Sequence, residues 1–248
     1  MRVLTICAHP NRRSFCHAIL EQFTKGLLEA GHTSDVVDLY AIRFNPVFGM
    51  KDFAYFADDS VPLDVLKSMN LKERVIASSG GPIRKFLVKR WLRDKSTRDV
   101  AKLVGKHKPR DVLEQQAKVR RAEGLAFIAP IYWMGFPAVL KGWVERVFNY
   151  GFAYSLTADG WRGDLSGRVP HLTQKKVLII STTFFSELHY KQGLEDAIRK
   201  TTDEWCFKYP GVQNVEHVYF YATRAVDVEA REEYLRKAFR LGRDFAES

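Results

Sequence analysis

Cysteine is scarce in this sequence, whose 248 residues contain only Cys7, Cys16 and Cys206. The three are odd in number and widely spaced, and they form no CxxC pair or other metal-ligand spacing, so neither a disulfide framework nor a metal site is indicated. We therefore expect no metal and a reducing, cytoplasmic location. Hydrophobic residues make up 46% of the chain, which is enough for a core that needs no disulfide or metal.

Long apolar runs, internal repeats and Gly-rich nucleotide motifs are also absent. No run approaches the roughly 20 apolar residues of a membrane span, and the first residues, MRVLTICA, are typical of a strand and not of a signal peptide. There is no GxGxxG, so the usual nicotinamide dinucleotide fingerprint is missing. The length fits one large α/β domain, and we expect residues 1–248 to form a single one.

The positive charge is concentrated in one segment, which begins at Arg84 and ends at Arg110. It holds eleven Lys or Arg against two Asp, a net charge of +9 out of +10 for the whole chain. We predict two short helices here, over residues 82–93 and 96–106, with a stripe of Phe86, Leu87, Trp91 and Leu92. The segment is consistent with a solvated helical excursion, a dimer-related lid, an anionic-membrane or partner surface, or a nucleic-acid patch. We favour the first two and expect no nucleic acid as partner, because no nucleic-acid motif accompanies the charge; peripheral contact with an anionic surface stays open.

Apolar β-branched runs alternate with amphipathic stretches along the chain. Strands are predicted at residues 2–8, 32–40, 124–129, 175–183 and 215–222. Helices are predicted at residues 15–30, 110–121, 136–150, 190–207 and 227–245, whereas residues 41–70 and 155–173 are expected to be irregular. The alternation predicts a flavodoxin-like doubly wound, five-stranded parallel sheet of order 2-1-3-4-5, with a basic helical insertion at about residues 71–110.

The candidate ligand site lies where three predicted strands end. Residues 130–137, PIYWMGFP, join a strand to a helix, and in open parallel sheets ligands bind outside the carboxyl ends of the strands. This loop presents Tyr132, Trp133 and Met134 with little charge, which suits a flat aromatic ligand. After the first strand, Ser14 is the expected N-cap of a helix whose free N–H groups suit a phosphate or diphosphate. A further aromatic loop begins at Phe184, after the fourth strand.

Four segments resemble one known family. They are AHPNRRSF at 8–15, DLYAIRFNPVF at 38–48, PIYWMGFPAVLKGWVERVF at 130–148 followed by GFAY at 151–154, and STT at 181–183 with Tyr190. In this order the chain resembles the NAD(P)H:quinone oxidoreductases of the DT-diaphorase type, which are FAD-containing members of the flavodoxin-like fold. Residues 136–154 are the specific part, because a chance match over that length is improbable.

The resemblance implies roles for individual residues. The positions that would bind the cofactor are His9, Arg13, Ser14, Phe15, Pro130, Ile131, Tyr132, Trp133, Met134, Thr182, Thr183, Phe184 and Phe185. The catalytic positions would be Tyr190, beside the flavin pyrimidine edge, and Tyr154, which would reach across a dimer interface. The substrate would contact Tyr154, Phe185 and Trp133.

The activity implied by the resemblance is a ping-pong hydride transfer from NAD(P)H, the cosubstrate, through FAD to a quinone or related aromatic acceptor, in a homodimer. FMN is the alternative cofactor. A different class of function also stays open: a flavin-binding regulatory or ancillary subunit with the same fold and low turnover.

The sequence departs from the family pattern at two places in the candidate site. The family commonly has two glycines after the Thr pair, where this chain has Phe184 and Phe185. The family's histidine shortly after the tyrosine is missing, and the nearby candidates are Glu195, Asp196 and His189. The acceptor slot and the proton relay of the family therefore do not carry over unchanged.

Overall fold

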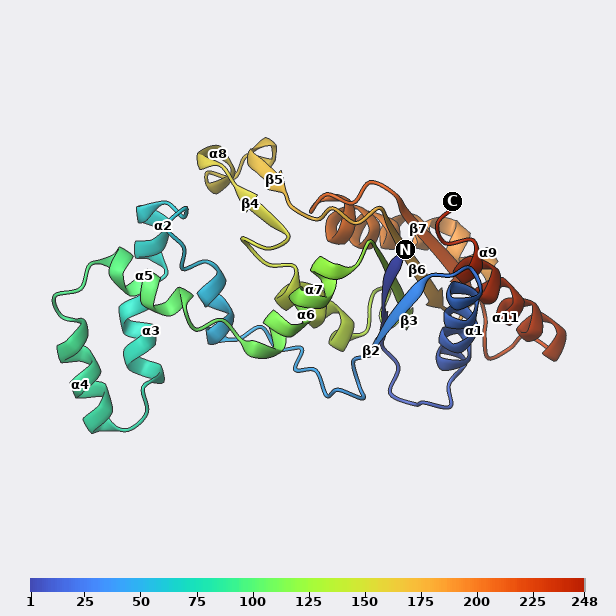
Figure 1. Cartoon of the computed structure of the whole chain (residues 1–248), viewed down its shortest axis with the longest axis horizontal. Coiled ribbons are helices and arrows are strands. Elements are labelled where there is room, and N and C mark those ends of the chain that lie inside the picture. Colours follow the sequence, from blue (N-terminus) through green and yellow to red (C-terminus); the bar gives the residue numbers. More distant parts are fainter. Residues whose placement is uncertain (248) are drawn as a thin grey trace.

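A five-stranded parallel sheet forms the centre of the computed structural model, which describes residues 1–247 (Figure 1). Its strands are β1 (Arg2–Cys7), β2 (Thr33–Asp38), β3 (Gly124–Pro130), β6 (Lys176–Thr182) and β7 (Val215–Phe220), in the order β2-β1-β3-β6-β7. The inner strands are buried almost throughout, as continuous apolar runs in a sheet covered on both faces should be. The predicted order 2-1-3-4-5 is confirmed, with β6 and β7 as the fourth and fifth strands of the sheet.

Helices cover both faces of this sheet. α1 (Phe15–Glu29) and α11 (Val228–Arg243) pack on one face, where Ile19, Phe23 and Ala238 join the strand residues in one hydrophobic cluster. α6 (Arg110–Arg121), α7 (Ala138–Val147) and η4 (Lys200–Lys208) pack on the other face. α1 and α11 approach closely at Gly26, where a Cβ atom would lie 2.0 Å from the carbonyl oxygen of Phe239. A larger residue there would push the two helices apart.

A helical unit precedes α6 and lies at one end of the molecule, away from the sheet (Figure 1). It contains α2 (Leu63–Ser68), α3 (Leu71–Ser78), α4 (Pro82–Leu92) and α5 (Thr97–Gly105), after the short turn η1 (Met50–Tyr55). Its core includes Val61, Leu66, Leu92 and Val100, and this core also takes in Tyr150. The two helices predicted in the basic segment are confirmed as α4 and α5. That this unit is an insertion within a single domain stays a prediction.

Two stretches predicted as irregular contain regular structure. Residues 41–70 include η1 and α2, and α3 begins directly after them. Residues 154–170 form a hairpin of β4 (Tyr154–Leu156) and β5 (Arg168–Pro170), with α8 (Ala158–Trp161) and η2 (Leu165–Gly167) between the strands. The prediction was wrong here because three-residue strands and helices of one or two turns are too short to show a hydrophobic period.

The helix predicted over residues 190–207 is broken. The structure has α9 (Glu187–His189), η3 (Tyr190–Leu194), α10 (Glu195–Arg199) and η4 in succession. The break lies at Gly193, whose φ of 106° is readily adopted only by glycine. Tyr190 and Glu195 lie on either side of this break, and both contact Tyr221.

Candidate functional site

Three loops leave the carboxyl ends of β1, β3 and β6 beside one another. The Ile131 N–H donates to the carbonyl oxygen of Thr182 at 2.9 Å, which joins the second loop to the third. Cys16 Sγ lies 3.2 Å from Thr182 Oγ1, which joins the start of α1 to the same strand end. The structure therefore brings the candidate residues of all three loops together, at the edge where parallel sheets bind ligands.

The first loop ends in the N-terminus of α1. Ser14 is the N-cap, and its hydroxyl accepts a hydrogen bond from the His17 N–H at 3.4 Å. The Asn11 N–H donates to His9 Nδ1 at 3.0 Å, and partial burial lowers the pKa of His9, which keeps its ring neutral. The Arg13 N–H donates to Asn11 Oδ1 at 2.9 Å, and its side chain is exposed. The loop is thus a compact turn that precedes the free N–H groups of a helix.

A carboxylate faces the same helix start. Asp38, at the end of β2, lies 3.3 Å from His17 Nε2 and 3.9 Å from Arg12 Nε. Its charge offsets that of Arg12, so an incoming anion would be attracted mainly by the helix N-terminus and by Arg13. Phe15, the first residue of α1, packs instead toward Tyr234 of α11, with ring centroids 6.4 Å apart.

The second loop contains a strained two-residue turn. Tyr132 and Gly135 exchange two backbone hydrogen bonds of 3.0 and 3.1 Å, and Trp133 and Met134 between them have φ angles of 47° and 58°. Such turns normally hold Asn or Gly at these positions, because side chains disfavour positive φ. The turn presents Trp133 fully to solvent, with 101% relative exposure, while Tyr132 and Met134 are each 42% exposed. Backbone strain of this kind is typical of ligand sites.

Hydrogen bonds to the carbonyl oxygen of Phe185 fix the third loop, which exposes two aromatic rings. Thr183 Oγ1 donates to the carbonyl oxygen of Phe185 at 2.7 Å, and this oxygen also accepts from the Ala222 N–H at 3.1 Å. Phe184 and Phe185 remain 63% and 47% exposed, with their rings edge to face at 5.3 Å. The bulky residues that replace the expected glycines are therefore on the surface of the site and not in the core.

Tyr190 lies behind the second loop. It is buried, and its ring packs against Tyr219 and Tyr221 with centroid distances of 5.9 and 5.8 Å. Ile131 belongs to the same cluster, which connects Tyr190 to the candidate ring-binding loop. Burial raises the pKa of Tyr190, so its phenol is neutral at neutral pH. The structure thus places Tyr190 near this loop, and its catalytic role stays a prediction.

Glu195 forms a buried polar cluster next to Tyr190. The Tyr221 hydroxyl donates to Glu195 Oε1, and Lys191 Nζ donates to Glu195 Oε2 at 3.2 Å. Arg199 lies 3.6 Å from the same carboxylate. Burial would raise the pKa of Glu195, but the hydrogen bonds from Tyr221 and Lys191 outweigh it and the pKa is lowered. Glu195 was one of three candidates in the sequence; its pairing with Tyr221 was not predicted, because the two residues lie on different elements.

His189, another of those candidates, stays on the surface. Its Nδ1 lies 2.9 Å from Ser186 Oγ, and its ring lies 6.1 Å from that of Phe185. Asp196 is exposed as well. Of the three residues near the missing histidine, only Glu195 contacts the tyrosine cluster.

A second buried cluster, centred on His217, was missed by the sequence analysis. His217 Nδ1 lies 2.8 Å from Asp203 Oδ1, and His217 Nε2 lies 2.8 Å from Ser181 Oγ. All three side chains are buried, and burial lowers the pKa of His217. The available signal was the presence of polar residues inside the apolar runs that became β6 and β7.

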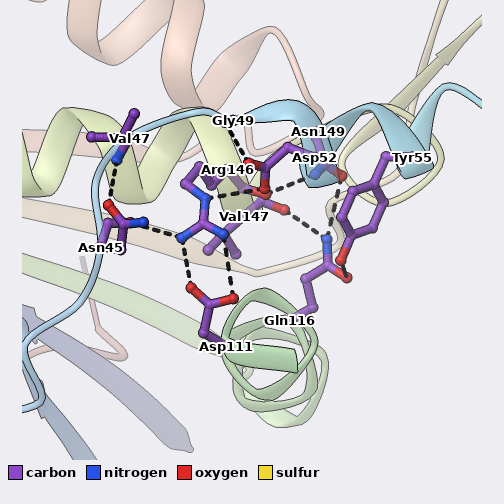
Figure 2. Close-up of polar contacts among 10 residues, drawn as sticks. All are labelled: Asn45, Val47, Gly49, Asp52, Tyr55, Asp111, Gln116, Arg146, Val147 and Asn149. Carbon is purple, nitrogen blue, oxygen red and sulfur yellow. Dashed lines mark hydrogen bonds and ion pairs between the residues drawn. The ribbon is translucent and has the colours of Figure 1, made fainter. Parts of the chain in front are cut away.

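A third buried cluster fixes α7, the helix that follows the second loop (Figure 2). Arg146 Nε donates to Asp52 Oδ1 at 3.0 Å, and its terminal nitrogens donate to Asp111 at 2.6 and 3.3 Å. The carbonyl oxygen of Asn45 accepts a further bond at 2.7 Å. Arg146 therefore joins η1, α6 and α7, and its side chain, 5% exposed, does not form a surface for a partner.

Tyr154 is the first residue of β4, which is not one of the three loops. It borders a cavity of about 510 Å³ next to α7 and η4. Residues lining this cavity include Phe48, Phe56, Phe148, Trp205, Cys206 and Tyr209. The Tyr154 ring packs edge to face on that of Tyr209 at 5.6 Å, and burial raises the pKa of Tyr154. None of the predicted cofactor-binding residues lines this cavity.

The structure describes no metal site and no membrane-spanning helix within residues 1–247. No group of three or more His, Cys, Asp or Glu in this range is arranged to hold a metal ion. No helix in the same range combines the length and the apolar composition needed to cross a membrane.

A parallel sheet of this order, with ligand loops at the carboxyl edge and no Gly-rich dinucleotide turn, defines the flavodoxin-like class of doubly wound proteins. Residues 1–241 match the family described as having a flavodoxin-like fold, and the chain belongs to this family.

Three known proteins similar to this chain are oxidoreductases by name. NAD(P)H dehydrogenase (quinone) 1 of Cavia porcellus is 30% identical over 78% of this chain and 57% of its own length. Ribosyldihydronicotinamide dehydrogenase-like protein traD of Penicillium crustosum is 26% identical over 97% of this chain and 80% of its own. The solved structure of NAD(P)H:quinone oxidoreductase from Methanothermobacter marburgensis has 27% identity and a TM-score of 0.69, covering 99% of this chain and 96% of that chain.

Proposed function

We propose that this protein is a flavin-dependent NAD(P)H oxidoreductase. It transfers a hydride in a ping-pong cycle from NAD(P)H through FAD to a quinone or related aromatic acceptor. The observation that carries the proposal is the meeting of three loops at one sheet edge, tied together by the Ile131–Thr182 and Cys16–Thr182 contacts. The names of the similar proteins, two of which are quinone oxidoreductases, support the same activity.

The residues of the second and third loops fit a planar aromatic group. Trp133, Phe184 and Phe185 present exposed rings, and exposed apolar side chains beside a strand end favour a flat ligand over water. Pro130 and Ile131 supply backbone next to Thr182 and Thr183. When bound, a flavin supplies the hydride chemistry, and the protein supplies orientation, exclusion of water and electrostatics.

The start of α1 fits the phosphate part of such a cofactor. Free N–H groups follow the Ser14 cap, and Arg13 is exposed beside them, while Arg12 is offset by Asp38. We propose FAD, whose diphosphate would lie across His9, Arg13, Ser14 and Phe15; FMN, with one phosphate, is the alternative. Release of the cofactor by denaturation and measurement of its mass distinguishes the two.

The active form proposed here is a cytoplasmic homodimer. Tyr154 borders a cavity that none of the predicted cofactor-binding residues lines, as expected for a residue that completes the site of a second copy. Tyr190, held behind Ile131, is proposed to orient the cofactor from the same chain, and Glu195 fixes its neighbour Tyr221.

The test is the purified protein with its cofactor. We expect flavin absorbance in the sample, or on addition of FAD, and oxidation of NADH or NADPH that depends on menadione. A protein that neither carries flavin nor binds added FAD or FMN would contradict the proposal.

The second candidate is a flavin-binding ancillary subunit with low turnover. The specific observation in its favour is the pair of bulky rings, Phe184 and Phe185, where an acceptor would stack. Bound flavin without menadione turnover, in both the natural protein and a Phe185→Gly variant with a widened slot, would favour this function.

A further inference from the structure

α4 has apolar residues on two opposite sides. Val88 and Leu92 face the core of the helical unit. The other side carries four large apolar side chains that are mostly exposed: Ile83 (76%), Phe86 (63%), Leu87 (57%) and Trp91 (55%). The first side explains how α4 packs. The second side, called here the outer face of α4, stays exposed to solvent within residues 1–247.

Basic side chains alternate with these apolar residues along α4. They are Arg84, Lys85, Lys89, Arg90 and Arg93, all exposed. None of the five forms an ion pair within the described part of the chain. The segment from residue 84 to residue 110 has a net charge of +9, whereas the rest of the chain sums to about +1. Exposed apolar side chains among Lys and Arg are the features by which a helix attaches to a negatively charged interface.

The position of α4 leaves the outer face accessible. Figure 1 shows α4 as the outermost element at one end of the long axis, with α3 and α5 between it and the rest of the molecule. A flat surface can therefore approach α4 without meeting the loops at the edge of the sheet.

We propose that α4 attaches this protein to the surface of an anionic lipid bilayer. Ile83, Phe86, Leu87 and Trp91 enter the boundary between headgroups and acyl chains, and the Lys and Arg side chains of the same helix bind lipid phosphates. Lys95 lies over the Trp91 ring, 4.5 Å from its centroid, which places a cation where an interfacial tryptophan meets the headgroups. The proposal does not depend on the reaction at the sheet edge.

A bilayer fits these residues better than a second copy of the chain does. Two copies that met through α4 would bring together two segments of +9, whose like charges repel each other. Nucleic acid would match the charge, but its phosphates offer nothing to four exposed apolar side chains.

The experiment is sedimentation of the full chain with vesicles of phosphatidylcholine, with and without phosphatidylglycerol. We expect binding only when phosphatidylglycerol is present, and release at high salt, since screening weakens the contacts with the headgroups. Leu87→Ser tests the apolar contact, with Leu28→Ser as the matched control, because Leu28 of α1 is 58% exposed against 57% for Leu87. Leu87→Ser should weaken binding about tenfold, and Leu28→Ser should leave it unchanged.

The charge is tested by the double variant Lys85→Gln, Lys89→Gln. We expect a loss of about tenfold to thirtyfold, with Lys51→Gln, Lys208→Gln as a control in which two other exposed lysines are neutralised. All of these side chains are exposed, so the variants should unfold at the same temperature as the natural protein, and circular dichroism checks this.

Three results would overturn the proposal. One is no preference for phosphatidylglycerol. Another is a dimer that Leu87→Ser converts to monomers in the absence of lipid, which would assign the outer face to a second copy. The third is retention on DNA that the double lysine variant abolishes and Leu87→Ser does not, without vesicle binding.

Discussion

Trp133 and Met134 have two consecutive positive φ angles, and neither residue type adopts this conformation without strain. The turn persists because the Tyr132–Gly135 hydrogen bonds close it and because Ile131 is anchored to Thr182. The same turn exposes the Trp133 side chain to solvent, where it can contact a ligand. The sequence alone did not reveal this, since the turn has no Asn-Gly signal.

The strain at Met134 can be measured. Met134→Gly should stabilise the protein by about 1 kcal/mol, because glycine adopts φ near 58° without a Cβ clash, and should raise Tm by about 2–4 °C for a chain of this size. Met134→Ala keeps the Cβ and serves as the control in thermal unfolding. If both variants shift Tm equally, side-chain packing and not backbone strain accounts for the effect.

His217 makes stability depend on pH. Burial lowers the pKa of His217 in the folded protein, so the unfolded chain binds more protons than the folded one as the pH falls through about 6.5. The contribution of His217 to the free energy of unfolding is therefore complete above that pH, and it is lost progressively below it. His217→Asn removes the titration and should give a flatter curve of unfolding free energy between pH 7 and pH 5 in urea titrations.

The quantity to compare is the difference in unfolding free energy between the natural protein and His217→Asn at each pH. His9 and His32 also have pKa values lowered by burial, so the natural protein and the variant will both lose stability in acid. A difference that stays constant with pH would show that His217 has the same pKa in the folded and the unfolded protein.

At the scale of elements, Arg146 is the residue that ties α7 to the segments before it (Figure 2). Arg146→Ala leaves Asp52, 2% exposed, as a buried carboxylate without its partner. We expect a loss of about 3–5 kcal/mol in the free energy of unfolding. Arg162→Ala, which breaks an exposed pair with Asp159, should cost less than about 1 kcal/mol in the same denaturant titration.

A double variant separates the buried charge from the packing of the arginine. Arg146→Met with Asp52→Asn should recover part of the loss, because the uncompensated carboxylate is gone and an apolar side chain fills the space. A double variant no more stable than Arg146→Ala would locate the cost in the contacts with Asp111 and Asn45.

What the sequence predicts well are the long elements. The five sheet strands and α1, α6, α7 and α11 have hydrophobic periods of enough residues to show, and their alternation determines the sheet order. α2 and the β4–β5 hairpin are too short to carry a period. The buried polar clusters could not be predicted, for a different reason. Arg146 and Asp52 are 94 residues apart, and no local sequence pattern indicates such a pairing.

The candidate site shows the same division. The positions of the three loops follow from the order of strands, so residues such as Ser14, Ile131 and Thr183 could be placed at one edge beforehand. The pairing of Glu195 with Tyr221 depends on the kink at Gly193. The apolar pattern instead predicts a continuous helix there.

At the scale of the whole molecule, we propose that a complete site needs two chains. Tyr154 borders a cavity whose lining includes none of the predicted cofactor residues. This arrangement is explained if Tyr154 acts on the site of a second copy, in a two-fold symmetric pair in which each chain supplies Tyr154 to the other.

Two inactive variants test this by complementation. Tyr154→Ala should bind flavin but turn over poorly. Ser14→Asp should lose flavin, because a carboxylate repels the phosphate, while aspartate still caps α1. After unfolding and refolding as an equal mixture with flavin, about half of the dimers pair the two variants, and each such dimer has one site with intact loops and a Tyr154 from its partner.

The expected result is recovery of about a quarter of the natural menadione reductase activity from two proteins that lack it alone, since half of the dimers carry one working site of two. If Tyr154 served its own chain, the mixed dimer would have one site without the tyrosine and one without flavin, and no activity would return. Mixed dimers detected by mass with no recovered activity would therefore refute action across the interface, because formation of the dimer and function of the site are measured separately.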